Sequence, residues 1–182
     1  MPRVTHHPPG NTATKPQAGD ILLTGVRSQG IYSWAIKAGS WLRRYEAPYR
    51  RFSHAVLVVS EDGSIVEALT KGVARGNLAK YDADDYVLVR VGVDAHDQAQ
   101  VLAFAESVLA ARTRYGFATI LGLALFCLSG AQLCIQWAGT AICSGFVCDA
   151  LTRAGYIWPR PPFAMMPADL ARYFDVHADP AG

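Results

Sequence analysis

Residues 53–69, which read SHAVLVVSEDGSIVEAL, carry the clearest hairpin pattern in the chain. Residues 53–60 are apolar and rich in β-branched side chains, residues 61–64 supply turn chemistry, and residues 65–69 resume the strand pattern. The stretch therefore predicts a β-hairpin, with a two-residue turn at Asp62-Gly63. In that register Glu67 lies on the same face as His54 but about 13 Å along it, at about 3.3 Å per residue.

The flanking sequence predicts strands first and helices afterwards. Turn residues and apolar runs indicate further strands, and apolar residues at helical spacing, with capping residues at the ends, indicate helices. The expected strands are 21–24, 72–75 and 86–91, and the expected helices are 33–42, 94–112, 143–154 and 167–173. Beyond Gly92 we expect the chain to be helical.

The composition fits one domain with one core. The chain has 182 residues, of which 51% are hydrophobic, and a net charge of +2, which is too small to indicate nucleic-acid binding. Residues 1–17 are rich in Pro, Thr, His and Gly and predict a disordered leader, followed by a single domain at 18–182. The leader carries no secretory signal, so we expect a cytoplasmic location, with membrane association or release by lysis as alternatives.

Residues 117–142 contain no charged side chain and are long enough to cross a bilayer. Gly and Gln residues interrupt the segment, and no Lys or Arg follows it before Arg153. Three interpretations stay open: a buried core helix with a loop, peripheral contact with a membrane surface, and a membrane span.

The four cysteines lie at positions 127, 134, 143 and 148, without the spacing of a zinc site, and we expect neither metal nor cofactor. Small residues precede Cys143, which opens a predicted helix. A thiol at a helix N-terminus has a lowered pKa and becomes a nucleophile as its thiolate. Cys143 is therefore the candidate nucleophile, although most free cysteines are simply small buried side chains.

A catalytic thiolate needs an imidazole nearby, and His54 is the best placed of the five histidines because it begins a strand. The base in turn needs a group that orients it. Glu67, on the next strand of the hairpin, is one candidate, and Asp20 and a backbone carbonyl are the others. An outward-facing edge position would explain Glu67 equally well.

Four pieces in this order carry a resemblance: Gly19-Asp20-Ile21-Leu22-Leu23, Ser53-His54-Ala55, Ile65-Val66-Glu67-Ala68 followed by Gly72-Val73, and Ile142-Cys143-Ser144. Together they resemble the circularly permuted branch of the NlpC-type, papain-like cell-wall peptidases, called YiiX-like and related to lecithin retinol acyltransferase. The pieces span nearly all of the chain after the leader.

The resemblance implies an α+β, papain-like fold in which a small antiparallel sheet packs against helices. It implies Cys143 as nucleophile, His54 as general base and Glu67 as the residue that orients His54. We further expect Tyr115 and Ser144 to contact substrate. Two positions depart from the family pattern, because Gly145 and Gly116 stand where members often carry acidic residues.

The expected function is hydrolysis or acyl transfer at an amide or ester bond through a thioester. The substrate would be a cell-wall peptide or a lipid-like acyl compound. The alternative is a non-catalytic binding module or a membrane-associated scaffold with the same fold. Neither the scissile bond nor the oligomeric state follows from the sequence.

Overall fold

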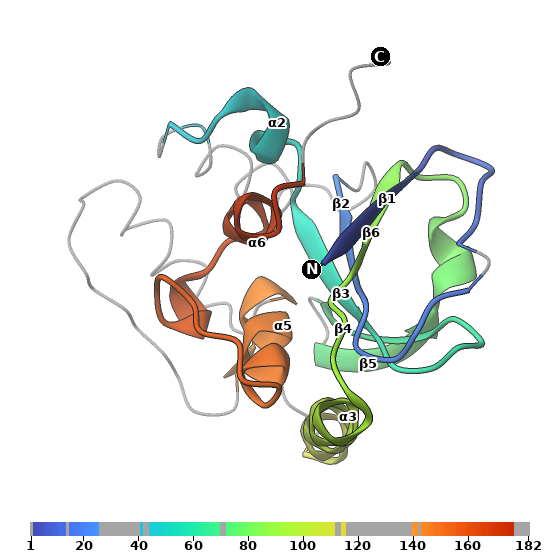
Figure 1. Ribbon diagram of the computed structural model, residues 1–182, viewed down its shortest axis with the longest axis vertical. Helices are drawn as coiled ribbons and strands as arrows, with labels where there is room; N and C mark the ends of the chain where they lie inside the picture. The colour runs from blue at the N-terminus through green and yellow to red at the C-terminus, as the bar shows by residue number, and fades with distance from the viewer. Residues whose placement is uncertain are drawn as a thin grey trace.

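The computed structural model describes the chain in eight stretches (Figure 1). The described residues are 2–13, 15–25, 41, 44–69, 72–111, 114–115, 140–141 and 143–176.

A six-stranded antiparallel sheet forms the centre of a mixed α+β fold, in the order β1-β6-β2-β3-β4-β5. Its strands are β1 (Arg3–His7), β2 (Ile21–Thr24), β3 (His54–Val58), β4 (Ser64–Leu69), β5 (Gly72–Asn77) and β6 (Tyr86–Arg90). Val, Ile and Leu dominate the central strands, as expected for strands buried on both faces. The strands predicted at 21–24, 72–75 and 86–91 are confirmed within one or two residues.

Helices come mainly from the second half of the chain. They are α2 (Ala47–Arg50), α3 (Ala95–Ala110), α5 (Cys143–Thr152) and α6 (Pro167–Tyr173), with the 3₁₀ turns η1 (Leu78–Tyr81) and η2 (Pro162–Ala164). The Asp94 side chain caps α3 by accepting a hydrogen bond from the Asp97 N–H at 2.9 Å. The region after Gly92 is not wholly helical, because β7 (Arg114–Tyr115) and β8 (Thr140–Ala141) pair in parallel.

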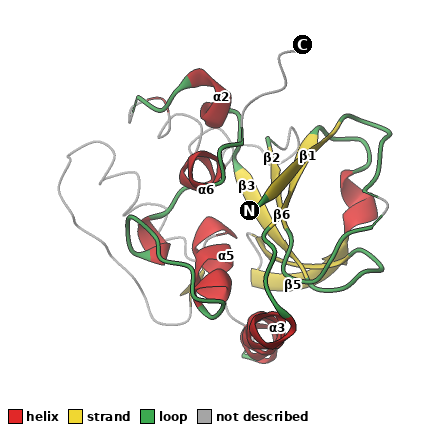
Figure 2. Cartoon of the chain, viewed as in Figure 1, coloured by secondary structure: helices red, strands yellow, loops and turns green. Residues whose placement is uncertain are grey.

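Helices α3, α5 and α6 lie on one side of the sheet (Figures 1 and 2), and the two faces of the sheet bury different side chains. One set packs against α3, α5 and α6 and includes Leu23, Ala55, Leu57, Val66, Ala68, Val87 and Val89. The other set packs on η1 and includes Leu22, Val56, Val58, Ile65, Tyr86 and Leu88. Side chains alternate along a strand, so His54 belongs to the same face as Val56, and Glu67 to the same face as Ile65.

The N-terminal segment differs from the expected disordered leader. Arg3–His7 forms β1, which pairs along its whole length with β6. The expectation of disorder rested on local composition, whereas the pairing depends on a strand about 80 positions further along the chain. An added edge strand satisfies backbone N–H and C=O groups of β6 that would otherwise face solvent.

The β3–β4 hairpin forms, but the predicted register is wrong. Leu57 pairs with Val66 and Val58 with Ile65, and the Val59 N–H donates to the Ser64 carbonyl at 2.8 Å. The connection is therefore longer than a two-residue turn, with Gly63 at a φ of 82°. The change moves Glu67 two positions closer to His54 along the hairpin.

A buried polar cluster fixes α6 to the segment before α2. The Asp169 carboxylate accepts hydrogen bonds from the Tyr45 hydroxyl, the Arg160 guanidinium and the Met166 N–H, the last at 2.9 Å. The Met166 bond also caps the N-terminus of α6. The cluster therefore links α6 to the segments that precede α2 and η2.

Several sequence-based predictions lie outside the described residues. These are the helix at 33–42, except for Trp41, the segment 117–139, and the side chains of Cys127 and Cys134. Within the described stretches, none of the helices combines the length and the hydropathy needed to cross a bilayer.

Candidate active site

His54 and Cys143 each begin a secondary-structure element, and the two elements touch. His54 is the first residue of β3, and Cys143 is the first residue of α5, which packs against β3 and β4 (Figure 1). Both residues are 2% exposed. The fold thus brings together two residues that are 89 positions apart in the sequence.

Glu67 is the hydrogen-bond partner of His54. The imidazole Nε2 lies 3.0 Å from Glu67 Oε2, and both side chains are almost fully buried. The last pair of the ladder joins Leu57 to Val66, so Glu67 follows directly after that pair on β4, two positions closer to His54 than in the predicted register. The corrected register therefore removes the gap that the two-residue turn implied.

Asp20, the alternative orienting group, lies at the other end of β2 from His54. Thr24 pairs with His54, whereas Asp20 precedes Ile21 and accepts a hydrogen bond from the Gln17 N–H at 2.9 Å. Asp20 also forms an ion pair with Arg90, at 3.4 Å. Of the two carboxylates, Glu67 is therefore the one that lies next to the imidazole of His54.

Two residues of η1 hold Glu67 from its other side. The Tyr81 hydroxyl donates to Oε2 at 2.8 Å, and the Lys80 ammonium forms an ion pair with Oε1. Burial alone would raise the pKa of Glu67, but the hydrogen bonds from His54, Lys80 and Tyr81 lower it to about 2. Glu67 is consequently ionised throughout the neutral range.

A glycine on the neighbouring strand makes room for this carboxylate. A Cβ placed on Gly76 of β5 would lie 3.3 Å from Glu67 Oε1 and 3.4 Å from a side-chain carbon of Ile65. The contact with Glu67 is closer than ordinary van der Waals contacts of a Cβ, and the contact with Ile65 lies at their lower limit. Gly76 therefore keeps the space in which Glu67 meets Lys80.

The Cys143 thiol lies where the β3–β4 ladder has ended. The described ladder consists of the pairs at Leu57 and Val58, so the Ala55 N–H, which points toward the same side as that of Leu57, is left for another acceptor. The Cys143 sulfur accepts hydrogen bonds from the backbone N–H groups of Ala55 and Ser144. The opened hairpin thus supplies a donor that a complete ladder would have used.

The electrostatics favour a thiolate–imidazolium pair. Burial raises the pKa of Cys143, but the hydrogen bond and positive charge of His54 outweigh it and hold that pKa below its usual value. Burial would lower the pKa of His54, yet Cys143 and Glu67 together raise it to about 9. Because Nε2 faces Glu67, Nδ1 is the nitrogen left for the sulfur.

Cys148, little more than one turn further along α5, shows how the surroundings shift the pKa of a buried thiol. It is also a free, fully buried thiol. Burial and the negative charges of Asp149 and Asp169 raise its pKa, and no histidine offsets them. Two cysteines on one helix therefore have pKa values shifted in opposite directions.

The two residues expected to contact substrate are placed only in part. The Ser144 side chain is buried and donates to the Met165 carbonyl at 2.6 Å, an anchor between α5 and the segment before α6. Only the backbone of Tyr115, in β7, is among the described residues. Substrate contact by either side chain stays a prediction.

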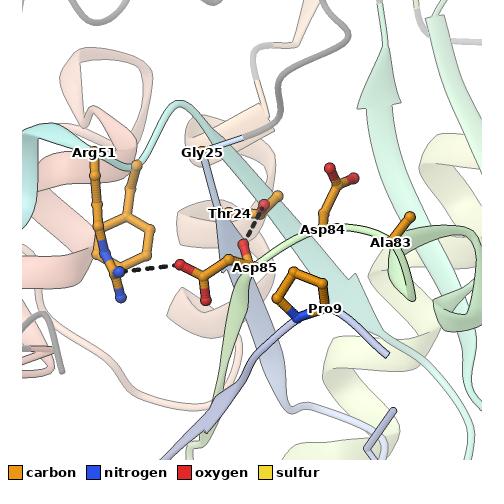
Figure 3. A pocket seen from close by; sticks show the side chains of 8 residues that line it. Pro9, Thr24, Gly25, Arg51, Ala83, Asp84 and Asp85 are labelled. Atoms are coloured by element: carbon orange, nitrogen blue, oxygen red, sulfur yellow. Dashed lines mark hydrogen bonds and ion pairs between the residues drawn. The ribbon is translucent and has the colours of Figure 1, made fainter. Parts of the chain in front are cut away.

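A cavity of about 240 Å³ opens at the sheet end that carries His54 (Figure 3). Thr24, the cross-strand partner of His54, lines it and donates to the Asp85 carbonyl at 3.0 Å. The Asp85 carboxylate faces Arg51 at 3.2 Å, and Asp84 lies on the opposite side of the opening. Charged side chains border this cavity, but His54, Glu67 and Cys143 are not among the described residues that line it.

Sequence reasoning did not find Lys80 and Tyr81. They follow β5 in a 3₁₀ turn, and nothing in the local sequence distinguishes them from a solvated loop. Within the described stretches, no group of three or more His, Cys, Asp and Glu side chains has the geometry of a metal site.

No protein-family model matches the chain, and no match was found among the curated proteins.

Proposed function

We propose that this protein is a cysteine-dependent hydrolase or acyltransferase with a permuted, papain-like arrangement of its catalytic residues. The observation that carries the proposal is the buried chain of contacts from Cys143 through His54 to Glu67. A thiol with a lowered pKa, a histidine with a raised pKa and a carboxylate behind that histidine are the three parts of a cysteine nucleophile system.

In the proposed reaction, the Cys143 thiolate attacks the carbonyl carbon of an amide or ester. The electron pair of the C=O bond moves to oxygen, where N–H groups at the N-terminus of α5 would stabilise the negative charge. The intermediate collapses to a thioester as the imidazolium of His54 transfers its proton to the leaving amine or alcohol. Water or an amine then attacks the thioester, gives up a proton to His54 and restores the thiolate.

Glu67 acts through His54. Its carboxylate fixes the ring so that Nδ1 faces the sulfur, and its charge stabilises the imidazolium before and after proton transfer. Lys80 and Tyr81 keep that carboxylate ionised and in place. The roles proposed for the three residues therefore differ, with Cys143 and His54 in contact with the reacting atoms and Glu67 as a positioning residue.

We propose that the acyl substrate extends into the cavity lined by Thr24, the cross-strand partner of His54, and that this cavity favours a polar substrate. Asp84, Asp85 and Arg51 border it, and such side chains suit the amides and charged groups of a peptide better than a hydrocarbon chain. We therefore place cell-wall-type peptides ahead of lipid-like acyl compounds as substrates.

Covalent trapping tests the proposal. The intact protein is incubated at neutral pH with a thiol-reactive acyl probe, and the modified peptides are identified by mass spectrometry. We expect rapid labelling of Cys143, loss of that labelling in His54→Ala, and unchanged labelling in Cys148→Ala, which removes the neighbouring thiol on the same helix. An unreactive Cys143 in a correctly folded protein would instead favour a non-catalytic binding module.

A further inference from the structure

A second cavity lies on the face of the sheet that is turned away from α5. It has a volume of about 230 Å³ and is bordered by Arg3, Thr5 and His7 of β1, by Leu88 and Arg90 of β6, and by Lys15. Ligand sites for drug-sized molecules occupy roughly 300–1,000 Å³, so a cavity of this size suits one small group.

The cavity is strongly cationic. Arg3, Lys15 and Arg90 bring three positive charges to its border, and none of the described residues that line it is acidic. One of these three cations, Arg90, forms an ion pair with the Asp20 carboxylate at 3.4 Å, and this carboxylate also accepts a hydrogen bond from the Gln17 N–H. Arg90 Nε is buried and has no hydrogen-bond partner in the described part of the chain. The net charge around the cavity is therefore positive.

His7 supplies the feature that points to a particular ligand. It is 8% exposed and stacks on Tyr86, with ring centroids 4.9 Å apart. Its Nδ1 lies 3.1 Å from the Asn11 carbonyl oxygen, which can only accept, so Nδ1 carries a proton. Nε2 is buried without a partner among the described residues. A buried nitrogen of this kind is costly unless a ligand or water completes its hydrogen bonding.

The surroundings of His7 favour its neutral form when the cavity is empty. Burial lowers its pKa, the hydrogen bond to Asn11 raises it, and neighbouring His6 lowers it again. Nε2 then carries a lone pair and needs a donor. An ionised carboxylate has no proton to offer, whereas a phosphate group is partly protonated near neutral pH, since the second pKa of phosphate esters is about 6.

We propose that this cavity binds a phosphate group, with Arg3, Lys15 and Arg90 as its cationic partners and His7 Nε2 sharing a proton with one phosphate oxygen. The site is separate from the proposed catalytic pair. His7 pairs with Tyr86, Tyr86 with Thr24, and Thr24 with His54, so His7 and His54 are three strand spacings apart, or about 14 Å. The proposal therefore stands whether or not Cys143 is catalytic.

The test is a titration of the intact protein with inorganic phosphate, followed by calorimetry and by the imidazole NMR signals of His7. We expect saturable binding with the same dissociation constant from both measurements. The double variant Arg3→Ser/Lys15→Ser should bind about tenfold more weakly or worse, because two charge-assisted contacts are lost. Arg153→Ser/Arg172→Ser removes the same charge from exposed positions elsewhere and should leave the affinity within about twofold.

Two further measurements, a titration with sulfate and sedimentation with lipid vesicles, complete the experiment. Sulfate resembles phosphate in shape but carries no proton at neutral pH, so it should bind several-fold more weakly, and equal affinity would overturn the role given to His7. Sedimentation with phosphatidylcholine vesicles, with and without phosphatidic acid, distinguishes a lipid headgroup from a soluble phosphate. Phosphate binding that is absent, or that weakens equally in both double variants, overturns the site itself.

Discussion

Replacing Glu67 with Gln removes a negative charge from behind His54 while keeping a side chain of nearly the same shape. The Glu67 carboxylate oxygen is 3.0 Å from the imidazole Nε2, and both groups are buried. A charge at that distance typically shifts a pKa by about 1–3 units, equivalent to about 1.4–4 kcal/mol. Without it, the imidazolium becomes less favourable, and the Cys143 thiolate loses part of its stabilisation. The pH of half-maximal thiolate formation should therefore rise by about one unit or more.

The assay is the rate of Cys143 alkylation by iodoacetamide as a function of pH, read by peptide mass spectrometry. A free thiol with a pKa of about 8.5 is roughly 0.3% ionised at about pH 6, so a Cys143 that is largely ionised there should react about 100-fold faster or more. In Glu67→Gln that advantage should fall by about tenfold or more, and in His54→Ala it should disappear.

Glu106→Gln is the matched control, because Glu106 also forms an ion pair, with Arg75, but is exposed on α3. Its alkylation profile should overlay that of the unmodified protein. If Glu67→Gln gave the same profile as Glu106→Gln, with its fold intact, the carboxylate would not be coupled to the thiol and the positioning role would be refuted.

Three further predictions concern the surroundings of the site. Gly76→Ala places a Cβ 3.3 Å from Glu67 Oε1, so alkylation of Cys143 should slow while circular dichroism stays unchanged, and an unaltered rate would contradict the tight fit. Since the pKa of Glu67 is lowered from 4.5 to about 2, its stabilisation is present above pH 4.5 and lost as the pH falls toward 2. Urea unfolding should show this loss, on the order of 3 kcal/mol, in the parent protein but not in Glu67→Gln. Asp169→Ala leaves Tyr45, Arg160 and the Met166 N–H without their acceptor, so the free energy of unfolding should fall by roughly 2–4 kcal/mol, and a loss below about 1 kcal/mol would count against the cluster.

Local signals were sufficient for the main elements of the fold. The helix at 167–173 was predicted at its observed bounds, and the helices after Gly92 and from Cys143 within about two residues. Each begins with a capping residue, a proline or small residues, followed by apolar side chains at helical spacing. The residues of the β3–β4 hairpin were also evident, because β-branched runs flank a turn sequence.

What local reasoning missed depends on contacts between distant parts of the chain. The hairpin register was wrong because Asp62-Gly63 fits a two-residue turn, while the observed connection runs over residues 60–63. The two registers differ by two residues and place the same side chains on each face of the sheet, so the hydrophobic pattern could not distinguish them. Arg3–His7 is a strand only because β6 is there to pair with it. Lys80 lies near Glu67 only because η1 folds back over the sheet. None of these outcomes leaves a signature in a short window of sequence.

The groups of the candidate site alternate in sign along their contacts, from the Cys143 thiolate through the His54 imidazolium and the Glu67 carboxylate to the Lys80 ammonium. Their charges sum to zero, so their fields largely cancel beyond the site. Such a row exerts little long-range attraction on a charged molecule in solution, and capture of a substrate would depend on contacts made after collision rather than on electrostatic steering. Dissolved ions reach this row mainly at Lys80, whose side chain is 40% exposed, so changes in ionic strength would be felt first at the end farthest from the sulfur.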